Sequence, residues 1–270
     1  MSYEFGLKLW STNTDHYFDE ARRLYADGVF SYVELYVIPD TLDTIEKWET
    51  LDIPVNLHCP HFFHGFNLAK REKEKINRTI HEQVKQFADA LNSEYIIFHC
   101  GVDGGIEESA RQLKAFTEPR AIIENKPYRP VPGINGKMCR GATIEEIKYV
   151  LDEVKCGFCL DIGHTICSAN SQKLDRWKYI EEFNKLKPKV YHLTDLENLG
   201  SEYDSHAHIG NGEVDISKVL LFITNESMIT IETEKNNPQE LADWKKDIRC
   251  LKRMIFSFNY ENKKSRTKRY

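Results

Sequence analysis

The sequence predicts a single (β/α)8 barrel, an α/β fold in which parallel strands alternate with helices. Eight short apolar runs recur along the 270 residues, with helical segments between them. Continuous apolar runs are typical of parallel strands buried on both faces, and such a barrel takes about 250 residues as one domain. The clearest runs are VNLHCPH (55–61), YIIFHCG (95–101), AIIENK (121–126), FCLDIGH (158–164), VYHLTD (190–195) and TIETE (230–234).

The first half of the chain is expected to form four strand and helix pairs. Its clearest helix covers 70–91, where Ile76, Ile80, Val84 and Phe87 return at helical spacing. The expected strands are 5–10, 32–38, 54–57 and the run within 95–101, and the expected helices are 17–26, a short one from Thr44, 70–91 and 106–116.

A long loop is expected to open the second half. Residues 126–141, KPYRPVPGINGKMCRG, are too rich in Pro and Gly for a regular element. Thr143 and Glu146 have the spacing of a capping box, which predicts a helix over 143–154. The other expected strands are 121–124 and the runs within 158–164, 190–195 and 230–234, and the other expected helices are 174–186, one from Ile216, and 239–256.

The charge is distributed unevenly along the chain. The net charge is −5, which does not favour broad electrostatic capture of nucleic acid, although local patches decide such binding. Residues 262–270, NKKSRTKRY, hold five basic residues and no acidic one. We therefore divide the chain into a barrel domain, 1–261, and a basic tail, 262–270. The tail is either a solvated end or an arm for nucleic acid or another anionic partner.

Nothing in the sequence predicts secretion or membrane association. The chain lacks an apolar run of the roughly 18 residues that a membrane helix needs, and MSYEFGLKLW lacks the regions of a signal peptide. Seven cysteines, an odd number, fit free thiols better than a disulfide framework. These features predict a cytoplasmic protein.

The apolar runs end in His, Asp and Glu side chains, which bind zinc and other divalent metals. The carboxyl ends of barrel strands meet at one face, where catalytic sites lie. Asp204 and His206 are two residues apart, so on an extended chain they point to one side. The candidate ligands are His58, His99, Glu124, Asp161, His164, His192, Asp204, His206 and Glu232.

Each candidate has an ordinary alternative when it is taken alone. A strand-end histidine can be a packing residue, and Asp161 with His164 could form a helix N-cap. One catalytic ion, however, needs about three protein ligands and an open position. Nine candidates on one rim therefore predict a multinuclear metal site and a metal-dependent enzyme.

The order and context of these residues resemble endonuclease IV, the apurinic/apyrimidinic endonuclease family of the xylose isomerase-like barrels. The resemblance spans roughly residues 5–256. The DxxH pattern at 161–164 is shared with related sugar isomerases and epimerases, whereas the complete set is more specific. The matching segments are HCP followed by NLA (58–60, 67–69), FHCG (98–101), IEN (123–125), LDIGH (160–164), HLTD (192–195), DSHAHIGNGE (204–213) and IET (231–233).

The resemblance implies two or three zinc ions held by the nine candidates, with Mn²⁺ or another divalent metal as an alternative. It implies that Glu124 and Glu232 bridge or anchor ions and serve as the catalytic carboxylates. Paired ions lower the pKa of a bound water and neutralise an attacked phosphodiester. Glu232 is then the candidate to orient that water as general base.

Four residues beside the metal ligands are candidates for substrate binding. Lys126 and Arg140, in the long loop, could bind a phosphate or could be solvated. His61 could line the site or face solvent. Phe62 could wedge into a base stack or pack on the barrel rim.

The loop after the second strand departs from the endonuclease pattern, which has basic residues there that hold DNA. Here VIPDTLDTIE contains Asp40, Asp43 and Glu46 and no Lys or Arg, and acidic groups repel phosphates. The segment from His58 to Asn67 is also about three residues longer than the family pattern.

Three functions therefore remain open. The first is a metal-dependent phosphoester hydrolase, with abasic-site DNA among its candidate substrates. The second is a sugar or sugar-phosphate isomerase or epimerase that uses one ion and two glutamates. The third is a non-catalytic barrel that binds a metal or ligand, because a fold alone does not define a function.

Overall fold

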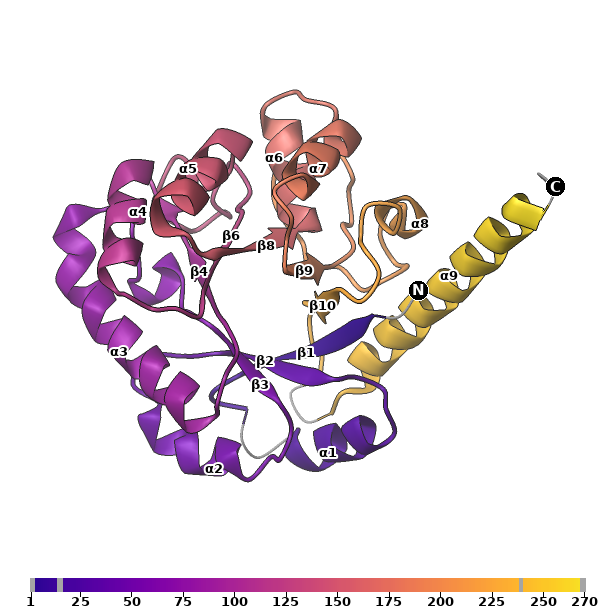
Figure 1. Cartoon of the computed structure of the whole chain (residues 1–270), viewed down its shortest axis with the longest axis horizontal. Helices are drawn as coiled ribbons and strands as arrows, with labels where there is room; N and C mark the ends of the chain where they lie inside the picture. Colours follow the sequence, from indigo (N-terminus) through magenta and orange to yellow (C-terminus); the bar gives the residue numbers. More distant parts are fainter. Residues whose placement is uncertain (1–2, 14–16, 238–239, 268–270) are drawn as a thin grey trace.

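Eight parallel strands close into a barrel in the computed structural model, which describes residues 3–13, 17–237 and 240–267 (Figure 1). Around the barrel the order is β1, β2, β3, β4, β6, β8, β9 and β10, and β10 pairs with β1. The predicted fold class is thus confirmed. The barrel strands are β1 (Glu4–Trp10), β2 (Tyr32–Tyr36), β3 (Val55–His58), β4 (Ile96–His99), β6 (Ala121–Glu124), β8 (Gly157–Asp161), β9 (Val190–Leu193) and β10 (Met228–Ile231).

Helices surround the barrel on its outside (Figure 1). One of them, α6, was not expected from the sequence, because almost all of its residues are buried and it lacks the polar face of an ordinary surface helix. The helices are α1 (Phe18–Ala26), α2 (Ile45–Glu49), α3 (Glu74–Ala90), α4 (Ile106–Ala115), α5 (Ile144–Val154), α6 (Ile162–Ser171), α7 (Arg176–Asn184), α8 (Ile216–Val219) and α9 (Ala242–Thr267), with short 3-10 turns at Leu42–Thr44, Phe62–His64 and Arg71–Lys73.

The long loop after β6 contains one regular piece that the sequence analysis did not predict. The short strand β7 (Cys139–Arg140) pairs antiparallel with β5 (Gly101–Val102). This pairing closes the loop against the segment that follows β4. The Pro-rich and Gly-rich remainder has no helix or strand, as expected.

The N-terminus of α5 is capped on one side only. Thr143 accepts a hydrogen bond from the backbone N–H of Glu146 at 3.2 Å, as the capping box requires. The Glu146 carboxylate instead accepts from the N–H groups of Gly141 and Ala142, at 2.7 and 3.3 Å. Glu146 therefore bonds to the two residues before Thr143 instead of to Thr143 itself, and these bonds secure the end of the long loop.

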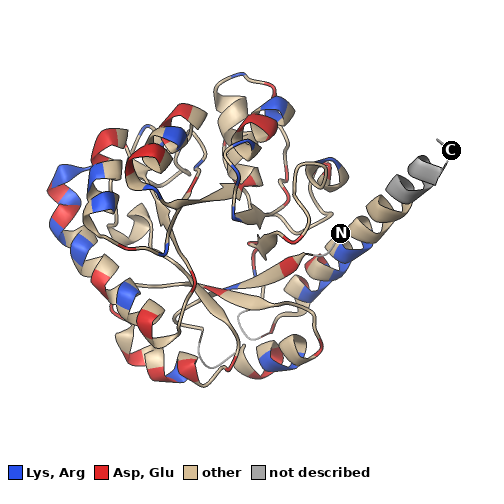
Figure 2. Ribbon diagram, viewed as in Figure 1, with Lys and Arg blue, Asp and Glu red and all other residues tan. Residues whose placement is uncertain are grey.

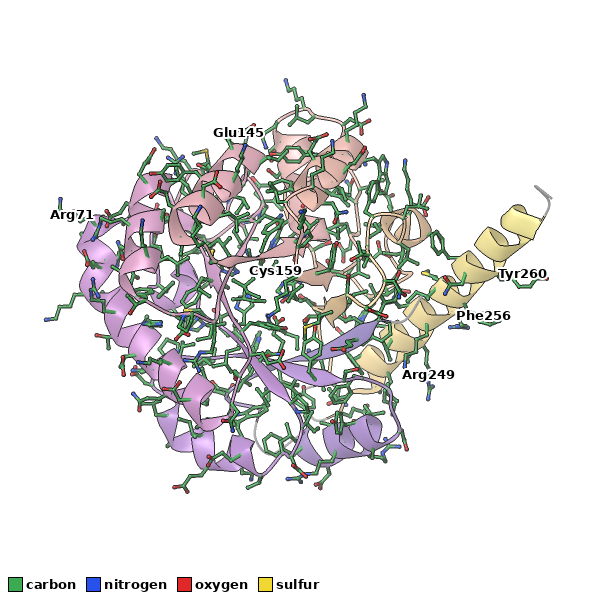
Figure 3. The ribbon with its side chains drawn as sticks, in the orientation of Figure 1. Arg71, Glu145, Cys159, Arg249, Phe256 and Tyr260 are labelled. Carbon is green, nitrogen blue, oxygen red and sulfur yellow. The ribbon has the colours of Figure 1, made fainter. Side chains whose placement is uncertain are left out.

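An apolar layer fills the barrel below the polar rim. It consists of Tyr32, Tyr95, Ile97, Ile122, Cys159 and Val190. Figure 3 shows Cys159 in the middle of the barrel. Gly6 on β1 faces this layer, and a Cβ there would lie 2.5 Å from the Tyr32 ring, so only glycine fits. All seven cysteines are free thiols.

Helix α9 projects well beyond the barrel (Figure 1). It continues to Thr267 and so crosses the boundary predicted at 261/262, while residues 268–270 of the predicted tail lie outside the described residues. Lys and Arg recur along α9 (Figure 2), and Phe256 and Tyr260 are exposed on its projecting part (Figure 3). Among the described residues no helix is both long and apolar enough to cross a membrane.

Candidate metal centre

The nine candidate ligands meet at the carboxyl ends of the strands. Strand register brings them together: His99 on β4 lies opposite Glu124 on β6, and Asp161 on β8 lies opposite His192 on β9. Six of the nine residues are buried, and Asp204 and Glu232 have side chains only 3% and 9% exposed. His206, with a side chain 37% exposed, is the most accessible of them.

A first group consists of His58, His99 and Glu124. The Nε2 atoms of the two histidines lie 3.1 and 2.8 Å from Oε2 of Glu124. Nδ1 of His58 lies 2.9 Å from the carbonyl oxygen of Cys59 and donates to it, which leaves the Nε2 lone pair for a metal.

A second group is centred on Nδ1 of His192. This atom lies 3.1 Å from Oε1 of Glu232, 3.5 Å from Oε2 of Glu124 and 4.0 Å from Oδ2 of Asp161. Three carboxylates therefore surround one imidazole nitrogen. The shared Glu124 makes this group contiguous with the first.

A third group joins His164, Asp204 and His206. Oδ2 of Asp204 lies 3.3 Å from Nε2 of His164 and 3.1 Å from Nε2 of His206. In both histidines Nδ1 lies 3.0 Å from a backbone carbonyl, that of Asn125 for His164 and that of Glu232 for His206. The backbone thus turns both Nε2 atoms toward the same carboxylate.

The donor atoms fit metal ions. Zinc ligands are imidazole nitrogens and carboxylate oxygens. Four sets of side chains have ligand atoms within 4.8 Å of one another: His58, His99 and Glu124; Glu124, Asp161 and His164; His164, Asp204 and His206; and His58, His192 and Glu232 together with Glu34 of β2. Among the described residues, Asp161 Oδ2, His192 Nδ1 and Asp204 Oδ2 are buried and have no hydrogen-bond partner. Buried polar atoms normally have partners, so these three atoms are poised for ions. The clustered donor atoms therefore have the chemistry to hold divalent metal ions.

Neighbouring charges and burial shift the pKa values of several candidate ligands. Burial raises the pKa of Glu124, but the charges of His99, Lys126 and His192 outweigh it and hold that pKa well below its usual range. Burial and the Asp204 charge raise the pKa of Asp161 to about 6. Burial lowers the pKa of His164, but nearby carboxylates, Asp161 first, raise it to about 10. At neutral pH Glu124 is therefore a carboxylate, and His164 holds a proton among carboxylates, where the surroundings favour a cation.

Comparison with known proteins places the chain in a family. The profile described as xylose isomerase-like TIM barrel matches residues 27–254. The chain belongs to the xylose isomerase-like TIM-barrel family. It is similar to a protein named probable endonuclease 4 from Thermosipho melanesiensis, at 26% identity over 205 residues, which are 70% of this chain and 72% of the relative.

Solved structures with the same fold include an endonuclease and an epimerase-like protein. Endonuclease IV from Thermus thermophilus matches with a TM-score of 0.66 and 17% identity, over 94% of this chain and 99% of that one. A D-tagatose 3-epimerase-like protein matches with a TM-score of 0.71 and 19% identity, over 96% and 99% of the two chains. Likeness at these identities shows the fold alone, and it includes both endonuclease and epimerase names.

In this family member the four predicted substrate residues lie in different environments. Lys126 is buried, with Nζ 3.2 Å from Nε2 of His164 and 3.7 Å from Oε1 of Glu124. The ring of His61 stacks on His99, with centroids 5.8 Å apart, and Phe62 follows it in the turn after β3. Lys126 and His61 therefore border the centre, and the Phe62 ring contacts that of His61, with centroids 5.0 Å apart.

Arg140 is placed differently. Its guanidinium donates to Oε1 of Glu146 at 2.9 Å and to the carbonyl oxygen of Gly104 at 2.5 Å. These partners belong to the β5–β7 region and the start of α5, so the structure uses Arg140 to hold the long loop. The structure shows no contact between Arg140 and the candidate ligands among the described residues.

Two charged residues beneath the centre were not identified from the sequence. Lys8 on β1 and Glu34 on β2 lie opposite each other in the strand register and are buried. Nζ of Lys8 lies 2.6 Å from Oε1 of Glu34 and 2.6 Å from Oε1 of Glu232. Each is the single charged residue inside an expected apolar strand. Because a buried charge without a partner is too costly, this pattern could have predicted that the two residues pair.

Asp195 organises the loop that carries Asp204 and His206. Its two carboxylate oxygens accept hydrogen bonds of 2.9–3.1 Å from four backbone N–H groups. Its own backbone pairs with Ala207 in both directions. The four donors belong to Leu196, Gly210, Gly212 and Val214.

His208, two residues after His206, belongs to a separate network. Its Nδ1 lies 2.8 Å from Oδ2 of Asp247 on α9, which also accepts from Thr233 at 2.6 Å. The side chain therefore ties the loop to α9 and is not part of the three ligand groups.

Proposed function

We propose that this protein is a metal-dependent phosphoester hydrolase of the endonuclease IV type, with a multinuclear zinc centre. The observation that carries the proposal is the overlap of the three ligand groups. Glu124 contacts members of all three, through His99, His192 and His164. A sugar isomerase that uses one ion has no need of the third group.

Bound zinc ions would lower the pKa of a water and neutralise the charge of the attacked phosphodiester. Glu124 would connect the ion positions, because its two oxygens face different histidines. Burial raises the pKa of Glu232, but the charges of His192 and Lys8 hold it well below its usual range. Glu232 therefore stays a carboxylate, and we assign it the orientation of the attacking water.

Lys126 is the proposed contact for a phosphate oxygen. Its ammonium group is buried beside Glu124 and His164, so a bound phosphate would meet a positive charge that solvent screens weakly. His61 and Phe62 are proposed to border the path of the substrate, and Arg140 is proposed to act only by holding the long loop.

A sugar-phosphate isomerase or epimerase is the second candidate. Asp40, Asp43 and Glu46 favour it, because they lie after β2 where acidic charge repels a nucleic-acid backbone. The structural likeness to an epimerase-like protein also favours it.

The deciding experiment measures incision of an abasic-site duplex across a salt series, beside hydrolysis and isomerisation of small sugar phosphates. We expect zinc-dependent incision that falls steeply with salt, since phosphate contacts release counterions. Isomerisation without any phosphoester cleavage would reject the hydrolase and select the second candidate.

A further inference from the structure

We propose that Lys8 and Glu34 form a charged support, built into the barrel, that fixes two metal ligands, His192 and Glu232, in their binding orientation. The inference rests on the proposed metal centre, but not on its substrate. The support consists of residues on β1 and β2, which contribute none of the nine candidate ligands.

Glu34 is a buried carboxylate whose oxygens are fully engaged. Nε2 of His192 lies 3.0 Å from Oε1 and 3.1 Å from Oε2. Oε2 also accepts from the hydroxyls of Thr230, at 2.8 Å, and Tyr95, at 3.2 Å. Lys8 donates to Oε1 at 2.6 Å, so every polar group that the structure places around this carboxylate is a donor to it.

This contact determines which nitrogen of His192 can bind a metal. With Nε2 protonated and donating to Glu34, the lone pair available for an ion is on Nδ1. Nδ1 is the atom that faces Glu232, Glu124 and Asp161 and has no hydrogen-bond partner. A carboxylate behind a ligating histidine fixes its tautomer and its ring orientation.

Lys8 extends the support to Glu232. Its ammonium group donates to Glu34 and Glu232 at 2.6 Å each, and its side chain is 9% exposed. Lys8 therefore restrains the Glu232 carboxylate while it offsets the charge of Glu34. A buried ion pair is weak evidence for stability, which makes a positioning role the better account of this one.

The test measures zinc affinity by chelator competition in Glu34→Gln and Lys8→Met, together with thermal unfolding of the metal-free proteins. For Glu34→Gln we expect a 10- to 100-fold weaker affinity for the ion held by His192. The matched control is Glu118→Gln, which alters another buried carboxylate beside a histidine, 3.8 Å from Nε2 of His81 and remote from the centre.

Lys8→Met separates positioning from simple electrostatics. Removing a positive charge beside Glu232 would tighten zinc binding if charge alone mattered, whereas loss of positioning weakens it. We expect weaker binding. Tighter or unchanged zinc binding in Lys8→Met would contradict the positioning role of Lys8. An equal loss of zinc affinity in Glu34→Gln and Glu118→Gln would contradict the role of Glu34.

Magnetic resonance of the wild-type protein provides a test that needs no variant. With ¹¹³Cd²⁺ bound and histidines labelled with ¹⁵N, we expect cadmium coupling at Nδ1 of His192 and a proton on Nε2. Coupling at Nε2 would make Glu34 a direct ligand and overturn the proposal. If these tests succeed but the protein does not incise abasic DNA, the proposed function is rejected and the positioning role of Lys8 and Glu34 stands.

Discussion

Asp161 and His164 are joined at the N-terminus of α6 by both oxygens of one carboxylate. Oδ1 accepts a hydrogen bond from the backbone N–H of His164 at 2.6 Å, and Oδ2 lies 3.6 Å from Nδ1 of its ring. The same side chain thus caps the helix and faces the candidate ions. Helix capping therefore fixes the position of two candidate ligands.

This relationship predicts that the metal-free protein becomes less stable as pH rises from 7 to 8.5. His164 has a pKa of about 10 in the folded protein and about 6.5 when unfolded, so its stabilisation is present below pH 6.5 and lost as pH rises toward 10. His192 acts in the same direction. The free energy of unfolding falls by at most about 1.4 kcal/mol per pH unit for each proton that the folded protein retains and the unfolded chain releases.

Urea denaturation in the presence of a chelator measures this effect. The zinc-loaded protein serves as the control, because an ion that replaces these protons removes the dependence. Equal free energies of unfolding at pH 7 and 8.5 without metal would contradict the raised pKa of His164.

Elemental analysis of protein purified without chelators is expected to find about three zinc ions per chain, since one ion needs about three protein ligands. His206→Ala should remove one ion, because it deprives the third group of one of its three members. His208→Ala is the control and should retain all of them, since His208 pairs with Asp247. A single ion in the wild type would favour the isomerase.

Glu232→Gln is expected to nearly abolish turnover while the fold persists. The amide oxygen can still accept a hydrogen bond from Lys8, but the charge that faces His192 is lost. Activity assays and circular dichroism measure the two effects. Glu234→Gln, at an exposed position nearby, should behave as wild type. Normal turnover in Glu232→Gln would disprove the assignment.

Asp195→Ala is expected to destabilise the loop that carries Asp204 and His206. It leaves buried backbone donors without an acceptor, which costs at least about 2 kcal/mol, and it should release the ion of the third group first. Asp215→Ala, which removes the exposed N-cap of α8, should cost about 1 kcal/mol and leave zinc content unchanged. Denaturation and zinc titration distinguish the two variants.

Much of the fold could be predicted from local patterns, and particular residues show where they failed. Strand β6 was predicted at its observed bounds because AIIE is a short apolar run beside a loop. Helix α6 was missed because eight of its ten residues are buried and so show no amphipathic period. The partners of Arg140 could not be predicted, because a loop sequence does not reveal that β7 pairs with β5.

By itself the sequence determined the barrel and the set of candidate ligands. Buried parallel strands can be recognised as apolar runs, and the carboxyl ends of barrel strands share one face. Only the tertiary structure decided which atoms of those residues face one another. The contacts of Lys8 with Glu232 and of Glu34 with His192 join strands far apart in the chain, and they depend on the register with which β1 pairs with β10. That register is fixed only when the barrel closes, because a shift of one residue turns every side chain to the opposite face.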